Sequence, residues 1–429
     1  MLRHIVKQAQ TMSPSESIAK KDTSQRRRDD ASVASNSADL TDVGEVAFLG
    51  IFEDILVDDP VSFDFDGSIS REHMRAIWSW LVRDVDPEIQ QTLTGVSSVV
   101  EAEKSLKALF PTVLTKARDA VSAASIEPES DRRLTAQLGG EDVRSRIPVV
   151  LNALRCHALL PKAVAFGKAS NSLTDEVALG TALQSMPLKE VGIAALLLHS
   201  VVGQAANPSR VVSAIGQIAG GSSEVVIKGA GFGPVIDGIL AHAQNQLSKL
   251  AGQNSLFADA DLMCKAVDRF HKLIRAVTGY VELERGSRWS MISAEITKNM
   301  AQGIGPRLRE VSADVSKSLR KPREGADRVD ADRLLAALNG IYLLESVRNA
   351  RESLALNALF EQIWGETGQT LEVLLQRNME LFKQDPTDSN TAQRLDMGIK
   401  MAEVRFNAEY AEILRKARDS VSRRIDKDD

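Results

Sequence analysis

Apolar residues recur at intervals of three and four over most of the chain, which is the spacing of amphipathic α-helices. One such stripe runs from Met74 to Val85, and Ser70 stands at the position of a helix N-cap before it. Trp78 lies on this stripe and is expected in the core, whereas Trp80 lies off it and is expected to be partly exposed. The pattern predicts an all-α protein.

The middle of the chain, residues 141–255, contains a recurring pattern. Prolines at positions 148, 161, 187, 208 and 234 each precede an apolar run, as expected for proline in the first turn of a helix. His157, His199 and His242 follow similar apolar patterns at intervals of 42 and 43 residues. Intervals of this length are typical of stacked helical hairpins of the HEAT type. Two architectures therefore stay open, a HEAT-like helical-hairpin array and an irregular multi-helix bundle.

The recurrent histidines do not predict a metal site. Equivalent positions on stacked helices lie about 8–10 Å apart, whereas each zinc ligand must lie about 2 Å from the metal. We expect hydrogen-bonded histidines on packed faces, and no metal or cofactor.

The two ends of the chain differ from its middle. Residues 1–44 offer little to bury and predict a disordered tail. Its charge is segregated, because residues 1–28 carry seven Lys/Arg and two acids, while residues 29–66 carry eleven acids and no Lys/Arg. Opposite blocks of this kind can attract each other, although a solvated tail is the simpler interpretation.

A turn cluster at residues 385–390 precedes a long amphipathic helix at the other end. Its apolar stripe needs a partner, which is either the body of the protein or another chain. The stripe consists of Leu395, Ile399, Ala402, Phe406, Tyr410, Ile413, Leu414, Ala417 and Val421. The predicted regions are thus a charged tail (1–44), an N-terminal helical region (45–140), a central helical-hairpin region (141–255), a basic-leaning helical region (256–384) and the C-terminal amphipathic helix (385–429).

Composition limits the function classes. The 429 residues carry a formal net charge of −5, which argues against a uniformly basic nucleic-acid binder. Two cysteines provide no disulfide framework and are typical of a reducing compartment, so we expect a cytoplasmic protein. No apolar run approaches the roughly 20 residues that a membrane span needs, so no membrane association is expected.

The sequence Phe63-Asp64-Phe65-Asp66-Gly67-Ser68 resembles the first motif of the haloacid-dehalogenase-like phosphohydrolases. The resemblance implies that Asp64 is a nucleophile, that Asp66 is its acid/base, and that an open parallel sheet surrounds them. The helical pattern elsewhere favours an acidic turn before Ser70 instead.

Two other motifs are weaker. An EF-hand register would put Ser62 and His73 at the first and last ligand positions, where His73 replaces the required glutamate. Residues 225–234 resemble a degraded dinucleotide-binding fingerprint, but Pro234 replaces its third glycine and the flanks predict helices. We therefore expect no catalytic residue.

One stretch is locally basic. Residues 265–323 carry thirteen Lys/Arg against six acids, with interleaved aromatic residues, a pattern that fits a groove for a single nucleic-acid strand. The alternative is a solvated helix face with internal ion pairs. The candidate nucleic-acid-binding residues are Lys265, Arg269, Lys272, Arg275, Arg285, Arg288, Trp289, Arg307, Arg309, Lys317, Arg320, Lys321 and Arg323.

These patterns lead to three hypotheses of function. The first is a non-enzymatic helical binding or assembly scaffold that uses the C-terminal helix for self-association or for a protein partner. The second is a nucleoprotein-like protein that binds single-stranded RNA through residues 265–323. The third, a haloacid-dehalogenase-like phosphohydrolase, rests on six residues alone.

Overall fold

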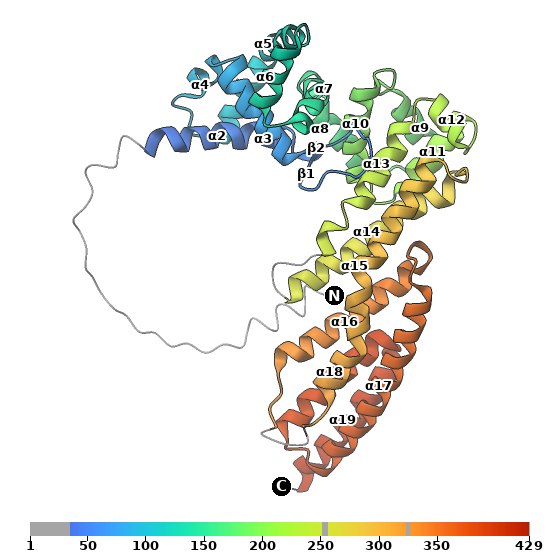
Figure 1. The fold of residues 1–429 in the computed structure, drawn as a ribbon. Helices are drawn as coiled ribbons and strands as arrows, with labels where there is room; N and C mark the ends of the chain where they lie inside the picture. The colour runs from blue at the N-terminus through green and yellow to red at the C-terminus, as the bar shows by residue number, and fades with distance from the viewer. Residues whose placement is uncertain (1–34, 251–255, 323–326, 429) are drawn as a thin grey trace, which may run out of the picture.

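The computed structural model describes residues 35–250, 256–322 and 327–428, and helices account for nearly all of them (Figure 1). The all-α prediction is confirmed. The predicted disordered tail falls mostly on residues 1–34, which lie outside the described residues, but helix α2 (Ser35–Ile51) already begins inside it.

The N-terminal helices enclose an aromatic core. Phe48 of α2 stacks on Trp78 with ring centroids 4.6 Å apart, and Phe52 stacks on Phe110 at 5.9 Å. The elements after α2 are η1 (Glu53–Ile55), β1 (Leu56–Val57), β2 (Ile69–Ser70), α3 (Arg71–Trp80), the π-helical turn η2 (Leu81–Val85), α4 (Glu88–Leu93), α5 (Val99–Ala124), α6 (Pro128–Leu138) and α7 (Glu141–Cys156).

The expectation that Trp80 is partly exposed was wrong, since Trp80 is buried. Helix α3 packs against α2 and also against α6 and α7, so both of its faces are covered. A single apolar stripe does not reveal a second covered face, because the residues that cover it lie far along the chain.

The central helices form a bundle around α10 (Val191–Gln204). Every residue from Ile193 to Val202 is buried, because α10 packs against α7, α8 and α13. Its neighbours in the sequence are α8 (Leu160–Ala169), α9 (Glu176–Gln184), α11 (Pro208–Ala219), α12 (Glu224–Gly229) and α13 (Gly233–Gln244). A helix covered on all sides favours the bundle interpretation over an open hairpin array.

The proline prediction is confirmed at three of its five positions. Pro161, Pro208 and Pro234 lie in the first turns of α8, α11 and α13. Pro148 instead lies inside α7, which starts earlier, after a glycine pair, and Pro187 lies in the turn before α10. Residues 225–228, read as strand in the dinucleotide fingerprint, belong to helix α12.

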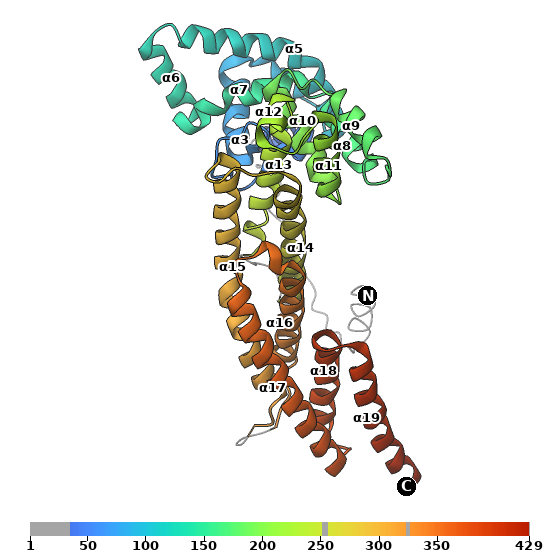
Figure 2. The same cartoon turned by 90° about the vertical axis from the view of Figure 1, so that its right-hand side faces the viewer.

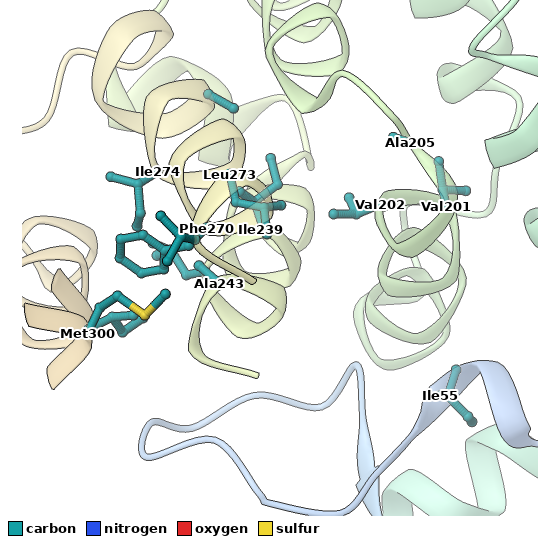
Figure 3. Close-up of a cluster of buried hydrophobic side chains, with 14 of the residues drawn as sticks. Ile55, Val201, Val202, Ala205, Ile239, Ala243, Phe270, Leu273, Ile274 and Met300 are labelled. Atoms are coloured by element: carbon teal, nitrogen blue, oxygen red, sulfur yellow. The ribbon is translucent and has the colours of Figure 1, made fainter. Parts of the chain in front are cut away.

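The remaining helices extend away from α2–α13, which we call the head, as an elongated arm (Figures 1 and 2). After the short turn η3 (Ser248–Leu250), the arm consists of α14 (Leu256–Tyr280), α15 (Arg288–Leu319), α16 (Ala331–Ala350), the turn η4 (Arg351–Ser353), α17 (Asn357–Gln384), α18 (Ser389–Arg405) and α19 (Ala408–Asp428). Where arm meets head, Phe270 and Ile274 of α14 and Met300 of α15 lie near Ile239 and Ala243 of α13 (Figure 3).

The long helix predicted for residues 385–429 is divided in two. Helix α18 ends at Arg405, and α19 begins at Ala408 and folds back against α18. Phe406 leaves the helical conformation, and the Asn407 side chain accepts a hydrogen bond of 2.7 Å from the Tyr410 amide. An N-cap of this kind starts a new helix, which explains why the continuous apolar stripe did not give one rod.

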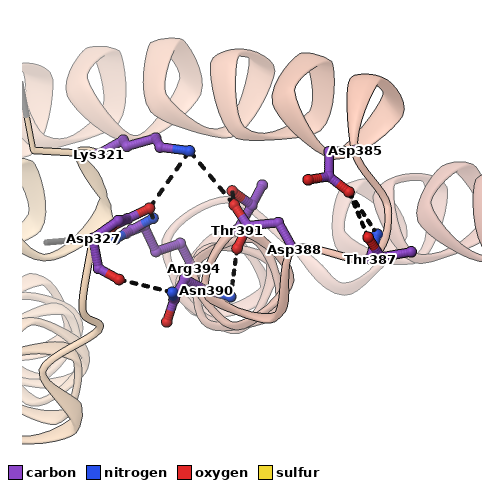
Figure 4. Close-up of polar contacts among 8 residues, drawn as sticks. All are labelled: Lys321, Asp327, Asp385, Thr387, Asp388, Asn390, Thr391 and Arg394. Carbon is purple, nitrogen blue, oxygen red and sulfur yellow. Dashed lines mark hydrogen bonds and ion pairs between the residues drawn. The ribbon is translucent and has the colours of Figure 1, made fainter.

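A polar network fixes the far end of the arm (Figure 4). Arg394 of α18 is 2% exposed and forms an ion pair with Asp327. Lys321 lies 3.5 Å from both Asp327 and Asp388, and Asp388 accepts a hydrogen bond from the Asn390 amide at the start of α18. The connection between α15 and α16 is thereby tied to the turn between α17 and α18.

No single described helix is both long and apolar enough to cross a membrane. The bent pair formed by α7 and α8, at 76° to each other, meets the criteria of length and composition only jointly.

Candidate functional site

The acidic motif lies in a loop that joins the N-terminal helices to the centre of the head. We call residues 58–68, between β1 and β2, the strap. Phe65 is buried between Ala195 of α10 and Ala241 of α13. The hydroxyl and amide of Ser62 donate to the Gln244 side chain at the end of α13, at 3.0 and 3.2 Å. The strap therefore lies across two central helices that follow it by more than a hundred residues.

Two arginines hold the backbone of the strap. Arg146 of α7 donates to the carbonyl oxygens of Phe65 and Ser68, both at 2.9 Å. Arg288, at the start of α15, donates to the carbonyl of Asp64 and lies 2.6 Å from the Asp237 carboxylate. Because their guanidinium groups bind carbonyls on the strap, α7 and α15 are coupled through it.

The phosphohydrolase resemblance finds no matching sheet in the described residues. Strands β1 and β2 are two residues long and pair with each other in parallel, Leu56 opposite Ile69. Asp66 lies 3.5 Å from Arg146, and the Asp64 side chain is exposed. The resemblance implies an open parallel sheet around these aspartates, and a two-stranded pair does not supply one.

A histidine pair lies beneath the strap. The rings of His199 and His242 stack with centroids 4.0 Å apart and 11° between their planes, and Phe65 packs 5.6 Å from His199. Nε2 of His242 lies 2.9 Å from the His199 carbonyl oxygen, while the buried Nδ1 of His199 has no hydrogen-bond partner among the described residues.

The predicted separation of 8–10 Å was wrong for this pair, as was the prediction that these histidines are fully hydrogen-bonded. Gly203 and Gly238 sit where α10 and α13 cross: a Cβ on Gly203 would lie 3.2 Å from the His242 ring. Glycine at such positions lets two helices approach closely. His157 lies apart, against the ring of Phe110 at 4.9 Å.

Acidification is expected to destabilise the fold through the histidine pair. Burial lowers the pKa of His242 to about 4 and that of His199 well below its usual range, and the positive charges of Arg269 and Lys249 add to the effect at His242. Unfolded histidine binds protons below about pH 6.5, so stability should fall between about pH 6.5 and 4, on the order of 3 kcal/mol for His242.

Urea unfolding measured between pH 7.5 and 4.5 tests this expectation. His242→Gln should flatten the acid limb, whereas His73→Gln should retain it because His73 does not contact the pair. An unchanged acid limb in His242→Gln would contradict this explanation of acid sensitivity.

A cavity of about 320 Å³ opens between the strap and α7. Its volume falls in the range of small-ligand pockets. The apolar wall consists of Val57, Pro60, Val61, Phe63 and Phe65, and the polar wall of Ser68, Ser70, His73, Asp142, Ser145 and Arg146. Ser70 precedes α3 as predicted, but its side chain makes no capping hydrogen bond. The sequence did not reveal this site, because its two walls lie some 70 residues apart in the chain.

The structure engages most of the candidate nucleic-acid-binding residues internally. Lys265, Lys272, Arg275, Arg288, Arg307 and Lys321 form ion pairs with Asp261, Asp268, Glu352, Asp237, Glu310 and Asp327, respectively. Arg269 donates to the carbonyls of Val202 and Ala205 at the end of α10, and buried Trp289 donates to Asp237 at 2.8 Å. Arg323 lies outside the described residues. Much of the local basic excess is thus balanced within the fold.

Four candidates are exposed and make no ion pair within the described ranges: Arg285, Arg309, Lys317 and Arg320. Arg285 lies in the loop before α15. The other three lie on one side of α15 and just past its end, opposite the faces that pack on α16 and α17. We call Arg309, Lys317 and Arg320 the basic stripe.

The outer face of α19 is a second candidate surface. This helix packs on α18 and less extensively on α17. Leu414, Ala417 and Val421 of the predicted apolar stripe are half-buried, but Ile413 is 65% exposed. The exposed residues of the outer face are Glu409, Glu412, Ile413, Lys416, Asp419, Ser420 and Arg423.

Comparison with known proteins gives no relative from which a role could be carried over. No family model, no curated protein and no solved structure matches the chain.

Proposed function

We propose that the protein is a non-enzymatic helical scaffold that associates with a second copy of the same chain through the outer face of α19. The supporting observation is Ile413, which is 65% exposed in the terminal helix of the arm. In layered helical arrays the last helix needs a polar outer face, and a large apolar side chain there favours a further partner.

The charges of this face favour a second copy. Glu409 and Arg423 lie seven residues on either side of Lys416. In an antiparallel pair with a twofold axis near Lys416, Glu409 of each copy faces Arg423 of the other, and both Ile413 side chains lie near the axis. Lys416 retains its own ion pair with Glu412, 3.9 Å away, which reduces repulsion across the axis. A contact of one helix is small, so the association should be weak and depend on concentration.

Sedimentation velocity over a concentration series tests this proposal. We expect the mass to rise from 46.7 kDa towards twice that value, and Ile413→Glu to keep the protein monomeric because it places a charge at the axis. Met291→Glu is the matched control, since Met291 is 61% exposed on α15, off the outer face of α19. A wild-type protein that stays monomeric at every concentration would overturn the proposal.

A second candidate function is the binding of single-stranded RNA, favoured by the basic stripe alone. Three exposed cations without ion pairs on one side of a helix suit contacts to successive phosphates. Lys272, Arg275 and Arg288 are poor choices for testing this idea, because each already pairs with a carboxylate.

The RNA candidate predicts a specific salt dependence. Reversing Arg309, Lys317 and Arg320 to glutamate should reduce the slope of log affinity against log salt by about 3, or about 1 per residue. Reversing the ion-paired Lys265, Lys272 and Arg275 changes the net charge equally and should have less effect. Fluorescence anisotropy with a labelled oligonucleotide measures both, and equal losses in the two variants would remove this candidate.

A further inference from the structure

The mouth of the strap cavity carries carboxylates that the fold does not neutralise. The strap contains four aspartates and no Lys or Arg. Asp58 pairs with Arg71 and Asp66 with Arg146, which leaves Asp59 and Asp64. Helix α7 adds Glu141 and Asp142, and within the described ranges none of these four carboxylates forms an ion pair. The cavity therefore attracts a cation.

The cavity wall also contains buried hydroxyls without partners. Ser68 and Ser70 are 3% and 6% exposed, both line the cavity, and neither side chain forms a hydrogen bond to a described residue. Buried polar side chains are almost always hydrogen-bonded, so these two groups indicate an occupant that brings N–H donors.

The opposite wall suits the stem of a long basic side chain. Val57, Pro60 and Val61 provide an apolar surface for methylene groups, and the Asp142 carboxylate can accept hydrogen bonds from a guanidinium. A Lys or Arg side chain therefore satisfies both walls at once.

We propose that this cavity binds the basic amino-terminal segment of the same molecule, at Arg26–Arg28. Residues 1–28 carry seven Lys/Arg against two acids, which complements the acidic strap. Chain length fits as well. Helix α2 has 17 residues and is about 25 Å long, and it leads almost directly into the strap. An extended chain covers that distance in about eight residues, and eight residues before Ser35 is Arg27.

Disulfide trapping in the full-length chain tests the proposal independently of α19. Arg27→Cys is combined with Ser145→Cys, because Ser145 is exposed on the cavity wall. The matched control combines Arg27→Cys with Ser185→Cys, an exposed position at the end of α9. The native Cys156 is buried and Cys264 is half-buried, and mass spectrometry identifies which cysteines are joined.

We expect an intramolecular 27–145 disulfide that forms at least tenfold faster than the control disulfide. Its rate should fall on adding salt and on changing Asp142 and Asp59 to asparagine, because both treatments weaken the attraction. Equal rates at positions 145 and 185 would overturn the proposal. Disulfides found exclusively between molecules would also overturn it, since they would show that the segment does not fold back on its own chain.

Discussion

Phe65→Ala is expected to reduce the free energy of unfolding by about 3–5 kcal/mol, the usual range for removing a buried aromatic ring. Phe65 fills the space between Ala195 and Ala241 and contacts the ring of His199. The alanines on either side are too small to close the resulting cavity. The strap should also detach, because Phe65 is its buried anchor, and amide hydrogen exchange of residues 58–68 should accelerate.

Two glycine variants test whether close packing is the reason. A Cβ on Gly67 would lie 2.7 Å from the Ala195 carbonyl oxygen, so Gly67→Ala should destabilise the protein as well. A Cβ on Gly229 in α12 meets nothing within 4 Å, and Gly229→Ala should be neutral or slightly stabilising. A loss below about 1 kcal/mol in Phe65→Ala would show that the strap does not depend on its buried ring.

Asp327→Ala is expected to destabilise the arm by about 3–5 kcal/mol, because it leaves the guanidinium of Arg394 buried without its counter-ion. Arg394 is 2% exposed, whereas Lys321, the second cation at Asp327, is 41% exposed and can turn to water. Lys321→Met should therefore have a much smaller effect. Chemical denaturation of the three proteins measures the difference.

A double variant separates the loss of the ion pair from a general loss of packing. Arg394→Met in the Asp327→Ala background replaces the stranded charge with an apolar side chain and should restore part of the lost stability. If the double variant is less stable than Asp327→Ala, the buried charge is not the main source of the loss.

Local periodicity was sufficient to predict the helices but not how they are covered. The stripe before Val85 gave α3, yet the burial of Trp80 depends on α6 and α7, which lie about 50 residues further along the chain. The stripe from Leu395 to Val421 ran continuously through two helices, because the Asn407 cap interrupts the backbone without interrupting the apolar spacing. A pattern of side chains reports which face is apolar, not where the backbone turns.

Counting charges had a similar limit at the candidate sites. The basic excess of residues 265–323 was correct as a count, but Arg275 and Arg288 pair with acids contributed from outside this range. The strap was visible as an acidic motif, whereas its contacts to Ala195 and Gln244 join positions more than a hundred residues apart. Partners at such separations follow from the packing of helices, which periodicity does not specify.

The most direct test of the scaffold proposal is the distance between the α19 helices of two molecules. A spin label at Ser420, in a chain that carries Cys264→Ser, reports it by pulsed dipolar spectroscopy. An antiparallel pair centred near Lys416 places the two backbones at position 420 about 15 Å apart, from the helical rise and the usual spacing of packed helices. The account predicts a short distance of this kind that disappears on dilution with unlabelled protein and in Ile413→Glu. A signal without any coupling between molecules, even in concentrated samples, would contradict it.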